Sequence, residues 1–468
     1  MRILFASAEA NPYWKTGGLA DVARSLPDAL VERGHDVRVI LPFYRPVRDR
    51  GFPLEESAVL DVPWPGDAVP TRFLLHRPPH GAPGVLVEGP DFFDTDDPYG
   101  APFGDVLALG RRFAFFCRAV VAYAKVWGAD IVHLNDWPTG LVPVYGLVDG
   151  LEAGTVFAIH NLPYQGNFPP ALVPQIGAPW GLYRPENGFE FWGQASFMKA
   201  GLALSARLVT VSPTYGAEIR TPDFGAGLDG LLRFRHGVLH GILNGIEPRV
   251  WDPAHDGALT RPFGPEQVGL KEENRAALLA ELGLTGDGPL FVAVTRLAYQ
   301  KGIDLILGAI WQIVESGASV AVLGSGDAGY EWTLGSMAGA APHRVAVRFG
   351  FDDGLARRLY AGGDFFLMPS RYEPCGLGQM IAQRYGTPPV VRHTGGLVDT
   401  VVDGVTGFAF HDASPAGLLS AVDRARRAWH DGSVEAIRRR CMELDWSWER
   451  SAAEYEEVYA CARAPAGG

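Results

Sequence analysis

Residues 15–21 read Lys-Thr-Gly-Gly-Leu-Ala-Asp, between a short apolar run and a stretch whose apolar residues recur at helical spacing. Residues 394–399, Thr-Gly-Gly-Leu-Val-Asp, nearly repeat this pattern toward the other end of the chain. Paired glycines let backbone N–H groups approach a ligand without an intervening side chain, and a helix that begins there adds about half a positive charge. Each segment is therefore predicted to open a helix with a carboxylate in its first turn and to bind an anionic, polyhydroxylated ligand.

Short, nearly continuous apolar runs alternate with helical patterns on both sides of these segments. Such runs are typical of parallel strands buried on both faces, which predicts an α/β fold with doubly wound sheets. The stretch after residue 18 keeps its helical spacing to Leu30 and stops near Gly34, so it forms the crossover of a strand, helix, strand unit. The predicted strands are residues 2–6, 36–41, 129–134, 155–159 and 208–211 in the first half, and 290–294, 319–323, 344–349, 364–368 and 389–391 in the second.

The chain has 468 residues, which is too long for a single hydrophobic core and predicts two domains of about 200 residues or more. Residues 247–269 lie between the two series of strands and are rich in Pro, Asp and Gly, so we interpret them as an interdomain linker or hinge. Two such domains imply a cleft.

The formal net charge is −12, with 41 Lys and Arg against 53 Asp and Glu. A field of this sign opposes nucleic acids and anionic membranes, so the bulk partner is expected to be neutral, although a local basic pocket can still hold a phosphate. The chain has no signal-peptide pattern and no uncharged apolar stretch of about 18 residues, which predicts a soluble, cytoplasmic protein. Its four cysteines are too scattered for a zinc site and too few for a disulfide framework, so free thiols are expected.

Ligands of doubly wound sheets bind outside the carboxyl ends of the strands, and polar residues recur there in both halves of the chain. If the two sheets oppose each other, both rims face one cleft. The residues of the first half are Lys15, Gly17, Gly18, Asn135, Asp136, His160, Asn161 and Asn244; those of the second half are Arg296, Lys301, residues 324–326, Arg371, Glu373, Gly395 and Gly396.

Each of these residues also has a plain structural interpretation when it is taken alone. Asp136 is as well placed to cap the helix that begins at Trp137 as to contact a ligand. His160 ends an apolar strand, where a hydrogen-bonded core histidine is more common than a catalytic one. Arg296 and Lys301 are compatible with an ordinary solvated pair, and the paired glycines with a tight turn.

Asp94-Thr95-Asp96-Asp97 is the main candidate for a divalent cation beside a diphosphate, since closely spaced carboxylates bind such ions. The segment lies in a loop rich in Pro and Gly and not at the end of a predicted strand, so a solvated acidic loop is the favoured interpretation. Residues 324–327, Gly-Ser-Gly-Asp, match only part of the dinucleotide fingerprint and do not favour nicotinamide binding. Cys375 has no readable base beside it and is interpreted as a packing or backbone-positioning residue.

A series of spaced motifs resembles the bacterial glycogen synthases and plant starch synthases, and the likeness runs in order from Met1 to about Trp448. Such a set is far more specific than a single glycine loop. The motifs are residues 15–21, Asn135-Asp136-Trp137, His160-Asn161-Leu162-Pro163-Tyr164-Gln165-Gly166, Lys199-Ala200-Gly201, Val211-Ser212-Pro213-Thr214-Tyr215, Ile242-Leu243-Asn244-Gly245-Ile246, Arg296-Leu297 with Gln300-Lys301-Gly302, Pro369-Ser370-Arg371-Tyr372-Glu373-Pro374-Cys375-Gly376-Leu377, and residues 394–397.

The resemblance implies a GT-B architecture, in which two Rossmann-like, doubly wound parallel-sheet domains face a deep cleft. It divides the chain into an N-terminal domain on the acceptor side (residues 1–245), a linker or hinge (246–269), a C-terminal domain on the nucleotide-sugar side (270–445) and a C-terminal helix that crosses back to the first domain (446–468).

The resemblance also implies a retaining glucosyltransferase that moves α-D-glucose from ADP-glucose to the non-reducing-end 4-hydroxyl of an α-1,4-glucan and so elongates glycogen. No metal ion or pyridoxal phosphate is expected, because cationic side chains and helix N-termini stabilise charge on the leaving diphosphate. The alternative is a related GT-B transferase with a small acceptor or a UDP-glucose donor. A glucan phosphorylase would need pyridoxal phosphate, and a catalytically silent glucan-binding protein would not need the charged residues that this chain carries.

By the same resemblance, Glu373 holds a glucose hydroxyl, Arg296 and Lys301 stabilise the diphosphate, and His160 lies over the transferred glucose; these four are the expected catalytic residues. The sequence offers no clear second carboxylate as nucleophile, so we favour attack on the same face, with the departing phosphate accepting the proton. Ile381 stands where a broader GT-B group has a glutamate, which leaves ribose recognition unassigned. The expected substrate-binding residues are Lys15, Gly17, Gly18, Asp21, Asp136, Asn161, Asn244, Cys375, Gly376, Leu377, Thr394, Gly395 and Gly396, and no metal ligand is expected.

Overall fold

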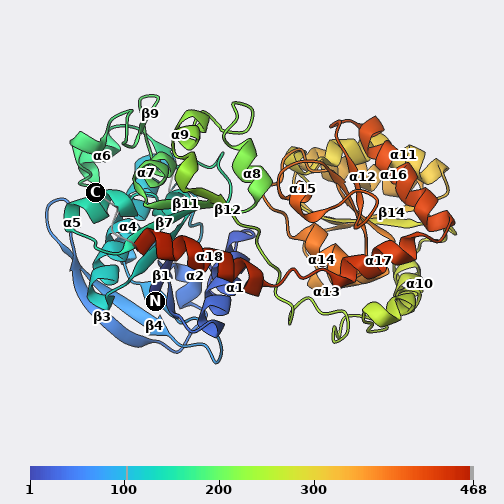
Figure 1. Ribbon diagram of the computed structural model, residues 1–468, viewed down its shortest axis with the longest axis horizontal. Coiled ribbons are helices and arrows are strands. Elements are labelled where there is room, and N and C mark those ends of the chain that lie inside the picture. The colour runs from blue at the N-terminus through green and yellow to red at the C-terminus, as the bar shows by residue number, and fades with distance from the viewer. Residues whose placement is uncertain (102–103, 464–468) are drawn as a thin grey trace. The chain divides into compact units, whose positions relative to one another are not determined.

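The computed structural model describes residues 1–101 and 104–463. The chain forms two compact units, and each is described here by itself. The first unit comprises residues 1–245 together with the last helix, from Trp448 onward, and the second comprises Ile246–Ser447 (Figure 1). The chain therefore passes from one unit to the other twice.

The first unit is built on a nine-stranded sheet with the order β12-β11-β7-β6-β1-β2-β5-β4-β3. The seven strands from β12 to β5 are parallel, and β4 and β3 continue the sheet as antiparallel strands. The strands are β1 (Arg2–Ala6), β2 (Asp36–Pro42), β3 (Glu55–Val62), β4 (Val69–His76), β5 (Gly84–Val87), β6 (Ile131–Asn135), β7 (Gly154–Ile159), β11 (Arg207–Thr210) and β12 (Leu239–Gly241).

All five strands predicted in the first half are present, within two residues at either end. The prediction missed the edge strands β3 and β12, the inner strands β4 and β5 between β2 and β3, and a separate three-stranded sheet of β8 (Asn167–Phe168), β9 (Glu190–Phe191) and β10 (Gln194–Ser196). For β3 the cause is visible in its burial. β3 is mostly exposed or half-buried along its length, so it lacks the continuous apolar run that marks the central strands.

Helices of the first unit connect the strands as crossovers. The predicted crossover helix is α1 (Leu19–Glu32), which buries one apolar stripe that includes Val22, Leu26 and Leu30. The longest helix, α4 (Val106–Trp127), is capped by the side chain of Asp105 at its start. The remaining helices are α2 (Arg45–Arg48), α3 (Pro90–Phe93), α5 (Val142–Asp149), α6 (Leu172–Gln175), α7 (Phe197–Leu204), α8 (Pro213–Glu218) and α9 (Asp229–Phe234), with short 3₁₀ turns at Trp137–Thr139, Trp180–Leu182 and His236–Val238.

The last helix, α18 (Trp448–Arg463), packs against α1 and β7 of the first unit (Figure 1). Its buried face carries Tyr455 and Tyr459, and the hydroxyl of Tyr459 lies 2.9 Å from Nδ1 of His133 on β6. On the surface, Glu456 accepts two hydrogen bonds from the guanidinium of Arg33 at 2.7 and 2.8 Å. The helix therefore completes the core of a unit whose other residues lie at the opposite end of the sequence.

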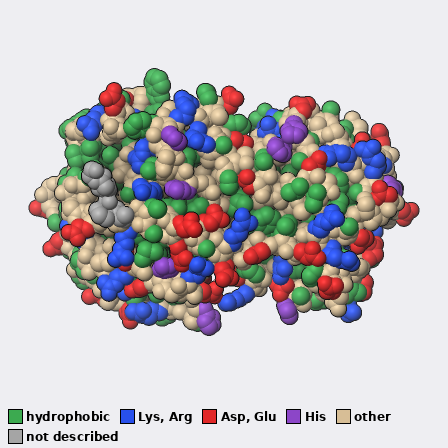
Figure 2. Space-filling model, viewed as in Figure 1, with side chains coloured by type: hydrophobic (Ala, Val, Ile, Leu, Met, Phe, Trp, Pro, Cys, Tyr) green, Lys and Arg blue, Asp and Glu red, His purple; other side chains and the backbone are tan. Residues whose placement is uncertain are grey.

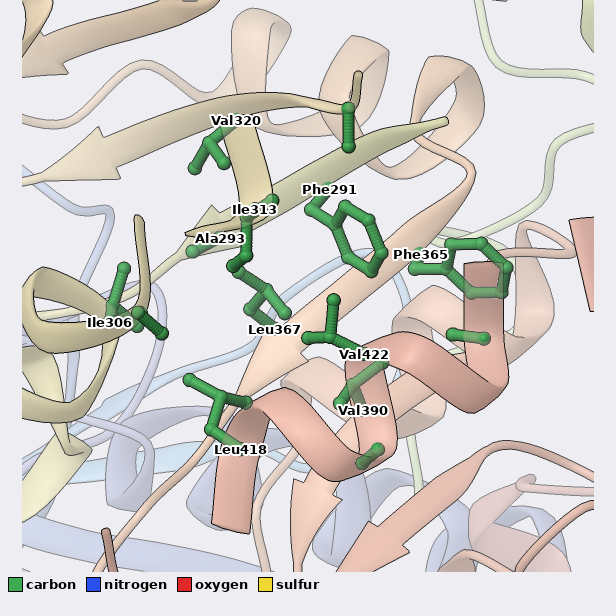
Figure 3. Packing of buried hydrophobic residues seen from close by; sticks show 14 of the residues in the cluster. Phe291, Ala293, Ile306, Ile313, Val320, Phe365, Leu367, Val390, Leu418 and Val422 are labelled. Carbon is green, nitrogen blue, oxygen red and sulfur yellow. The ribbon is translucent and has the colours of Figure 1, made fainter. Parts of the chain in front are cut away.

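The second unit has a six-stranded, fully parallel sheet with the order β15-β14-β13-β16-β17-β18. The five predicted strands are present, and only the edge strand β18 was missed. Apolar side chains of the strands meet those of α11 (Ile303–Glu315) and α16 (Pro415–His430) in one continuous core (Figure 3). The strands are β13 (Leu290–Val294), β14 (Ser319–Gly324), β15 (Val345–Phe349), β16 (Phe365–Met368), β17 (Pro389–Arg392) and β18 (Phe408–Phe410).

Helices cover both faces of this second sheet. Figure 1 shows α11, α12 and α16 on one side of it and α13 and α14 on the other. The repeat of the glycine motif opens a short helix, α15, as predicted. The helices are α10 (Lys271–Leu282), α11 (Ile303–Glu315), α12 (Ala328–Ala340), α13 (Asp353–Gly362), α14 (Gly378–Arg384), α15 (Gly396–Thr400), α16 (Pro415–His430) and α17 (Val434–Glu443), with 3₁₀ turns at Pro265–Leu270 and Tyr299–Lys301.

The segment interpreted as a linker is packed on the second unit. Asp256 is buried and accepts hydrogen bonds from Arg357, at 3.1 Å, and from the hydroxyl of Tyr385. The guanidinium of Arg357 also stacks over the ring of Trp251, 4.6 Å from its centroid. Richness in Pro, Gly and Asp indicates irregular backbone, which here is fixed by side-chain contacts; that the segment acts as a hinge stays a prediction.

The composition gave expectations for the charged surface and for the cysteine side chains of the folded protein. Acidic and basic side chains are interspersed over the face shown in Figure 2. Among the described helices, none is long and apolar enough to cross a membrane. The four cysteines are free thiols as expected; Cys117, Cys375 and Cys441 are buried and Cys461 is exposed.

Candidate active site

The first glycine loop is open on its outer side. A Cβ atom placed on Gly17 or Gly18 would meet no heavy atom within 4 Å. Gly18, which precedes α1, has φ −67° and ψ −20°, a conformation that any residue adopts. Neither packing nor backbone conformation therefore requires glycine at Gly18, and the bare backbone leaves room for a ligand to approach.

A carboxylate that the sequence analysis did not single out holds this loop. Oε2 of Glu9 accepts hydrogen bonds from the backbone N–H of Thr16 (2.5 Å), the hydroxyl of Thr16 (2.7 Å) and the backbone N–H of Gly17 (3.2 Å). The N–H groups of Thr16 and Gly17 are therefore engaged within the chain in this structure, and the binding of an anion by this loop stays a prediction. Glu9 could have been found from the sequence, because it is an acidic residue that closely follows the carboxyl end of β1, as other candidate site residues follow other strands.

Lys15 and Asp21 form an ion pair across the loop. Nζ of Lys15 lies 2.8 Å from both carboxylate oxygens of Asp21, and Nδ2 of Asn11 donates to the same carboxylate at 2.6 Å. The lysine side chain remains about half exposed. Asp21 therefore orients Lys15, and a pair this exposed adds little to stability.

Asp136 clamps the loop that follows β7. Its Oδ1 accepts the backbone N–H groups of His160 at 2.8 Å and Asn161 at 3.4 Å. It makes no side-chain hydrogen bond to the 3₁₀ turn at Trp137, so the interpretation as an N-cap is wrong. Asp136 has φ 53° and ψ −175°, a conformation that costs a non-glycine residue of the order of 1–3 kcal/mol. Burial raises the pKa of Asp136 to about 7, against the opposing effect of the two N–H donors.

We expect the variant Asp136→Asn to be more stable than the parent at neutral pH. The folded protein binds the Asp136 proton more tightly than the unfolded chain does, because its pKa rises from 3.8 to about 7. Stability from this group is therefore present below about pH 4 and is lost as the pH rises toward 7. Asparagine keeps the acceptor oxygen and does not ionise. Urea unfolding between about pH 5.5 and 8.5 checks this: the advantage of the variant should grow up to about pH 7 and then level off, and a pH-independent difference contradicts it.

In the second unit, Lys301 and Glu373 are paired next to the carboxyl ends of the strands. Nζ of Lys301 lies 2.6 Å from Oε2 of Glu373, which also accepts the hydroxyl of Ser370 at 2.9 Å. The backbone oxygen of Glu373 accepts the N–H of Gly396, so the loop of residues 370–376 is bonded to the second glycine loop. Glu373 is 6% exposed, which makes this an ion pair with limited screening by water.

Arg296 differs from its basic neighbours in having no fixed partner. It is exposed, and the described residues give its guanidinium no hydrogen bond or ion pair. Arg371, by contrast, is held by Asp304 at 2.5 Å and stacks over Tyr299 at 4.1 Å. Arg296 is thus a cation whose hydrogen-bonding capacity is available to an anionic ligand.

The glycines of the second site region are required by the protein itself. Gly395 has φ 47° and ψ −138°, and Gly376 has φ 78°, both unfavourable for other residues. A Cβ on Gly396 would lie 2.4 Å from the carbonyl oxygen of Cys375. These glycines let two backbone segments approach closely, whereas Gly17 and Gly18 leave space for something outside the chain. Leu377 precedes α14 at its start.

Asn244 is buried and its Oδ1 has no hydrogen-bond partner among the described residues. An unpaired buried acceptor costs about 1–3 kcal/mol, so it points to a donor that a ligand or water supplies. Asn244 follows β12, the strand next to β11 at one edge of the first sheet.

The structure divides the predicted residues between the two units. Glu9 with the glycine loop, and Asn135 and Asp136 with His160, form two bonded groups in the first unit. Lys301, Glu373 and Gly396 form one in the second. The roles assigned to these residues stay predictions. The first unit holds Lys15, Gly17, Gly18, Asp21, Asp136, His160, Asn161 and Asn244, and the second holds Arg296, Lys301, Glu373, Cys375, Gly376, Leu377, Thr394, Gly395 and Gly396.

Two aromatic residues, Tyr99 and Phe351, were not predicted. Burial, with an added contribution from the charge of Glu9, raises the pKa of Tyr99 well above its ordinary value, which places this phenol beside Glu9 and Asp136. Phe351 follows β15 and is 89% exposed. An aromatic face this open at a strand end is suited to stack on a planar ring. Its strand-end position was the signal that could have found it.

The acidic loop of residues 94–97 is tied down by arginines. Arg45 pairs with Asp94 at 3.0 Å and with Asp96 at 2.8 Å, and Arg48 also contacts Asp94. These ion pairs lower the pKa of Asp94. Within the described ranges, no three His, Cys, Asp or Glu side chains gather in a way that could hold a metal ion.

Two family models match the chain, one on each unit. The starch synthase catalytic domain matches residues 2–234, and the glycosyl transferases group 1 domain matches residues 274–432. Two doubly wound units that carry these domains define a glycosyltransferase of the GT-B class.

Whole-chain comparisons narrow the class. The chain is 48% identical to a glycogen synthase of Anaeromyxobacter dehalogenans and 44% identical to one of Syntrophotalea carbinolica, over 98% of its length and at least 98% of theirs. It superposes on the catalytic domain of Arabidopsis thaliana starch synthase IV, solved with ADP and acarbose, with a TM-score of 0.88, 32% identity and 99% coverage of both chains. The chain belongs to the glycogen synthase and starch synthase family. A sucrose-phosphate synthase of Thermosynechococcus elongatus, 20% identical with a TM-score of 0.61 over 98% of both chains, shares the fold.

Proposed function

We propose that this enzyme transfers α-D-glucose from ADP-glucose to the non-reducing-end 4-hydroxyl of an α-1,4-glucan with retention of configuration. The observation that carries the proposal is the similarity to glycogen synthases over nearly the whole chain, at 41–48% identity. ADP and acarbose, a nucleoside diphosphate and an oligosaccharide mimic, are bound in the solved starch synthase IV. The same two kinds of ligand are the substrates proposed here.

The charges of the site suit a leaving nucleoside diphosphate. As the glycosidic bond breaks, negative charge develops on phosphate oxygens, and cations placed there in advance stabilise the transition state. Arg296 has no partner among the described residues, and Lys301 and Lys15 each offer an ammonium group held by one carboxylate.

In this proposal Glu373 binds the glucose that is transferred. Its Oε2 is engaged by Lys301 and Ser370, which leaves Oε1 to accept a glucose hydroxyl. A retaining enzyme that used a covalent intermediate would need a carboxylate nucleophile on the opposite face of the ring. Asp136 is committed to two backbone N–H groups, so we favour same-face attack, with the departing phosphate accepting the acceptor proton.

The proposed reaction uses neither a metal ion nor pyridoxal phosphate. Lys15, Arg296 and Lys301 supply the positive charge that a divalent cation otherwise provides beside a diphosphate. We therefore expect full turnover of ADP-glucose in excess chelator. A loss of activity that only added divalent metal restores would contradict this and would favour a metal site at residues 94–97.

One glycogen-primed assay tests the proposed function. The purified enzyme is given ADP-glucose or UDP-glucose with glycogen, and separately with glucose and fructose 6-phosphate as small acceptors. We expect ADP release and lengthened α-1,4 chains from ADP-glucose with glycogen. Transfer confined to the small acceptors, or a clear preference for UDP-glucose, contradicts the proposal and favours the alternative of a related transferase with that acceptor or donor. Absorbance from a bound pyridoxal group in the purified enzyme would instead indicate a phosphorylase.

A further inference from the structure

His160 and Asn135 form a hydrogen-bonded pair at neighbouring strand ends of the first unit. Asn135 is the last residue of β6, and His160 follows β7, its neighbour in the sheet. Nε2 of His160 lies 2.8 Å from Oδ1 of Asn135. Asn135 is fully buried and the imidazole is half-buried.

The hydrogen bond made by Nδ2 of Asn135 determines which atom of the amide faces the imidazole. Nδ2 of Asn135 lies 2.9 Å from the backbone oxygen of Ala6, which can only accept a hydrogen bond. The amide nitrogen is thus fixed on Ala6, and the amide oxygen must face His160. Because that oxygen is an acceptor, Nε2 of His160 carries the proton.

The second ring nitrogen of His160 is left as an acceptor. Burial lowers the pKa of His160 to about 4, so the ring is neutral at physiological pH and Nδ1 holds a lone pair. In the described part of the chain, no group hydrogen-bonds to Nδ1, and this atom is not among the fully buried unpaired ones. The ionisable groups around the ring are His133 on β6, Asp136 and, through Asp136, Glu9. The pKa of His133 is lowered by burial to about 3, so His133 is also neutral.

We infer that Asn135 is a positioning residue that holds His160 in the Nε2–H tautomer, so that Nδ1 accepts a hydrogen bond from a hydroxyl of the bound glucosyl donor. The ligand in this inference rests on the proposed function, whereas the tautomer is a property of the chain alone. An acceptor at this place recognises a group that donates, and it discriminates against a sugar in which that hydroxyl is replaced by hydrogen.

Two variants of Asn135 separate this role from a merely structural one. Asn135→Leu removes the acceptor and is expected to lower kcat/KM about 10–100-fold, as for a misdirected buried hydrogen bond. Asn135→Asp keeps an acceptor for Nε2–H, but its negative charge raises the pKa of His160. Below that pKa both ring nitrogens carry protons and Nδ1 cannot accept. The activity of Asn135→Asp relative to the parent should therefore fall at low pH and recover at high pH.

The new carboxylate of Asn135→Asp also raises the pKa of its neighbour Asp136, so the ratio to the parent enzyme does not cancel that titration. The pH at which the ratio recovers is therefore compared with the pKa of His160 measured by NMR in the same variant. A loss that is the same at every pH in Asn135→Asp, or parental kcat/KM in Asn135→Leu, would overturn the inference. ADP-glucose analogues that lack one hydroxyl at a time give a further readout. One analogue should be discriminated against by the parent and less so by Asn135→Leu, and equal discrimination by both enzymes for every analogue contradicts the role.

Nitrogen NMR of ¹⁵N-histidine-labelled enzyme tests the tautomer without any substrate. The chain has 12 histidines, and the signal of His160 is assigned by its absence in His160→Gln. We expect an Nε2–H tautomer that does not titrate between about pH 5.5 and 8.5. An Nδ1–H tautomer in the parent enzyme refutes the inference, even if no variant of Asn135 folds. If the parent transfers no glucose, the proposed function fails while the spectrum still decides the tautomer.

Discussion

With Arg296 replaced by alanine, kcat/KM for ADP-glucose is expected to fall about 10²–10³-fold while the free energy of unfolding stays unchanged. Removing one preorganised donor from a developing anion costs about this much in rate. The side chain is exposed and has no partner among the described residues, so its loss leaves no buried group unpaired. Steady-state kinetics with glycogen and urea unfolding of the same preparation measure both quantities.

A matched control for this variant is Arg439→Ala. Arg439 is an exposed arginine on α17 with no ion pair in the described structure, so its removal changes the net charge equally. We expect parental activity and stability from this control. Near-parental turnover in Arg296→Ala, or an equal loss in both variants, would contradict the assignment of Arg296 to the diphosphate.

Replacing Glu373 by glutamine is expected to lower kcat about 10²–10³-fold and also to destabilise the second unit. The amide keeps an acceptor for Ser370 but removes the charge that faces Lys301 at 2.6 Å. An ammonium left beside a neutral amide in a largely buried place costs of the order of 1–3 kcal/mol. The loss of the charge also weakens the interaction with a glucose hydroxyl at the transition state, so kcat and kcat/KM should fall together.

The double variant Glu373→Gln/Lys301→Met separates the two effects. Removing the unpaired ammonium should restore much of the stability, because the buried charge is gone. Activity should stay low, since both groups of the site are then absent. Recovery of activity along with stability would show that Glu373 matters only as the partner of Lys301.

The central strands of both sheets could be predicted because they are buried on both faces. Residues 290–294 are an example, since nothing polar interrupts them and their bounds were predicted without error. The strand β3 could not be found in this way, because this antiparallel edge strand is mostly exposed or half-buried and its apolar residues are discontinuous. β8 and β9 are two residues each, too short for any periodicity to show.

The residues of the candidate site were predicted from their type and from their positions after strands. The hydrogen-bond and ion-pair partner of each residue could not be predicted from the sequence. Lys15, Glu373 and His160 were singled out because they follow strands, but their partners depend on how segments far apart in the chain meet. Glu9 was overlooked for the same reason, since its three hydrogen bonds to the glycine loop exist only in the folded protein. The sequence position of Asp136 favours an N-cap and a ligand contact equally, and only the fold shows that its side chain instead accepts the N–H groups of His160 and Asn161; a ligand contact stays a prediction.

The position of α18 has a consequence for how the protein is made. The first unit is interrupted by the whole of the second, so α18 leaves the ribosome only after the second unit and the rest of the described first unit. Until then, His133 on β6 lacks Tyr459, and α1 and β7 lack the helix that packs against them. The second unit, whose residues are continuous from Ile246 to Ser447, can complete its core earlier. The half of the protein that is translated first is therefore the half that is finished last, and a chain that stops near Ser447 leaves an incomplete first unit beside a complete second one.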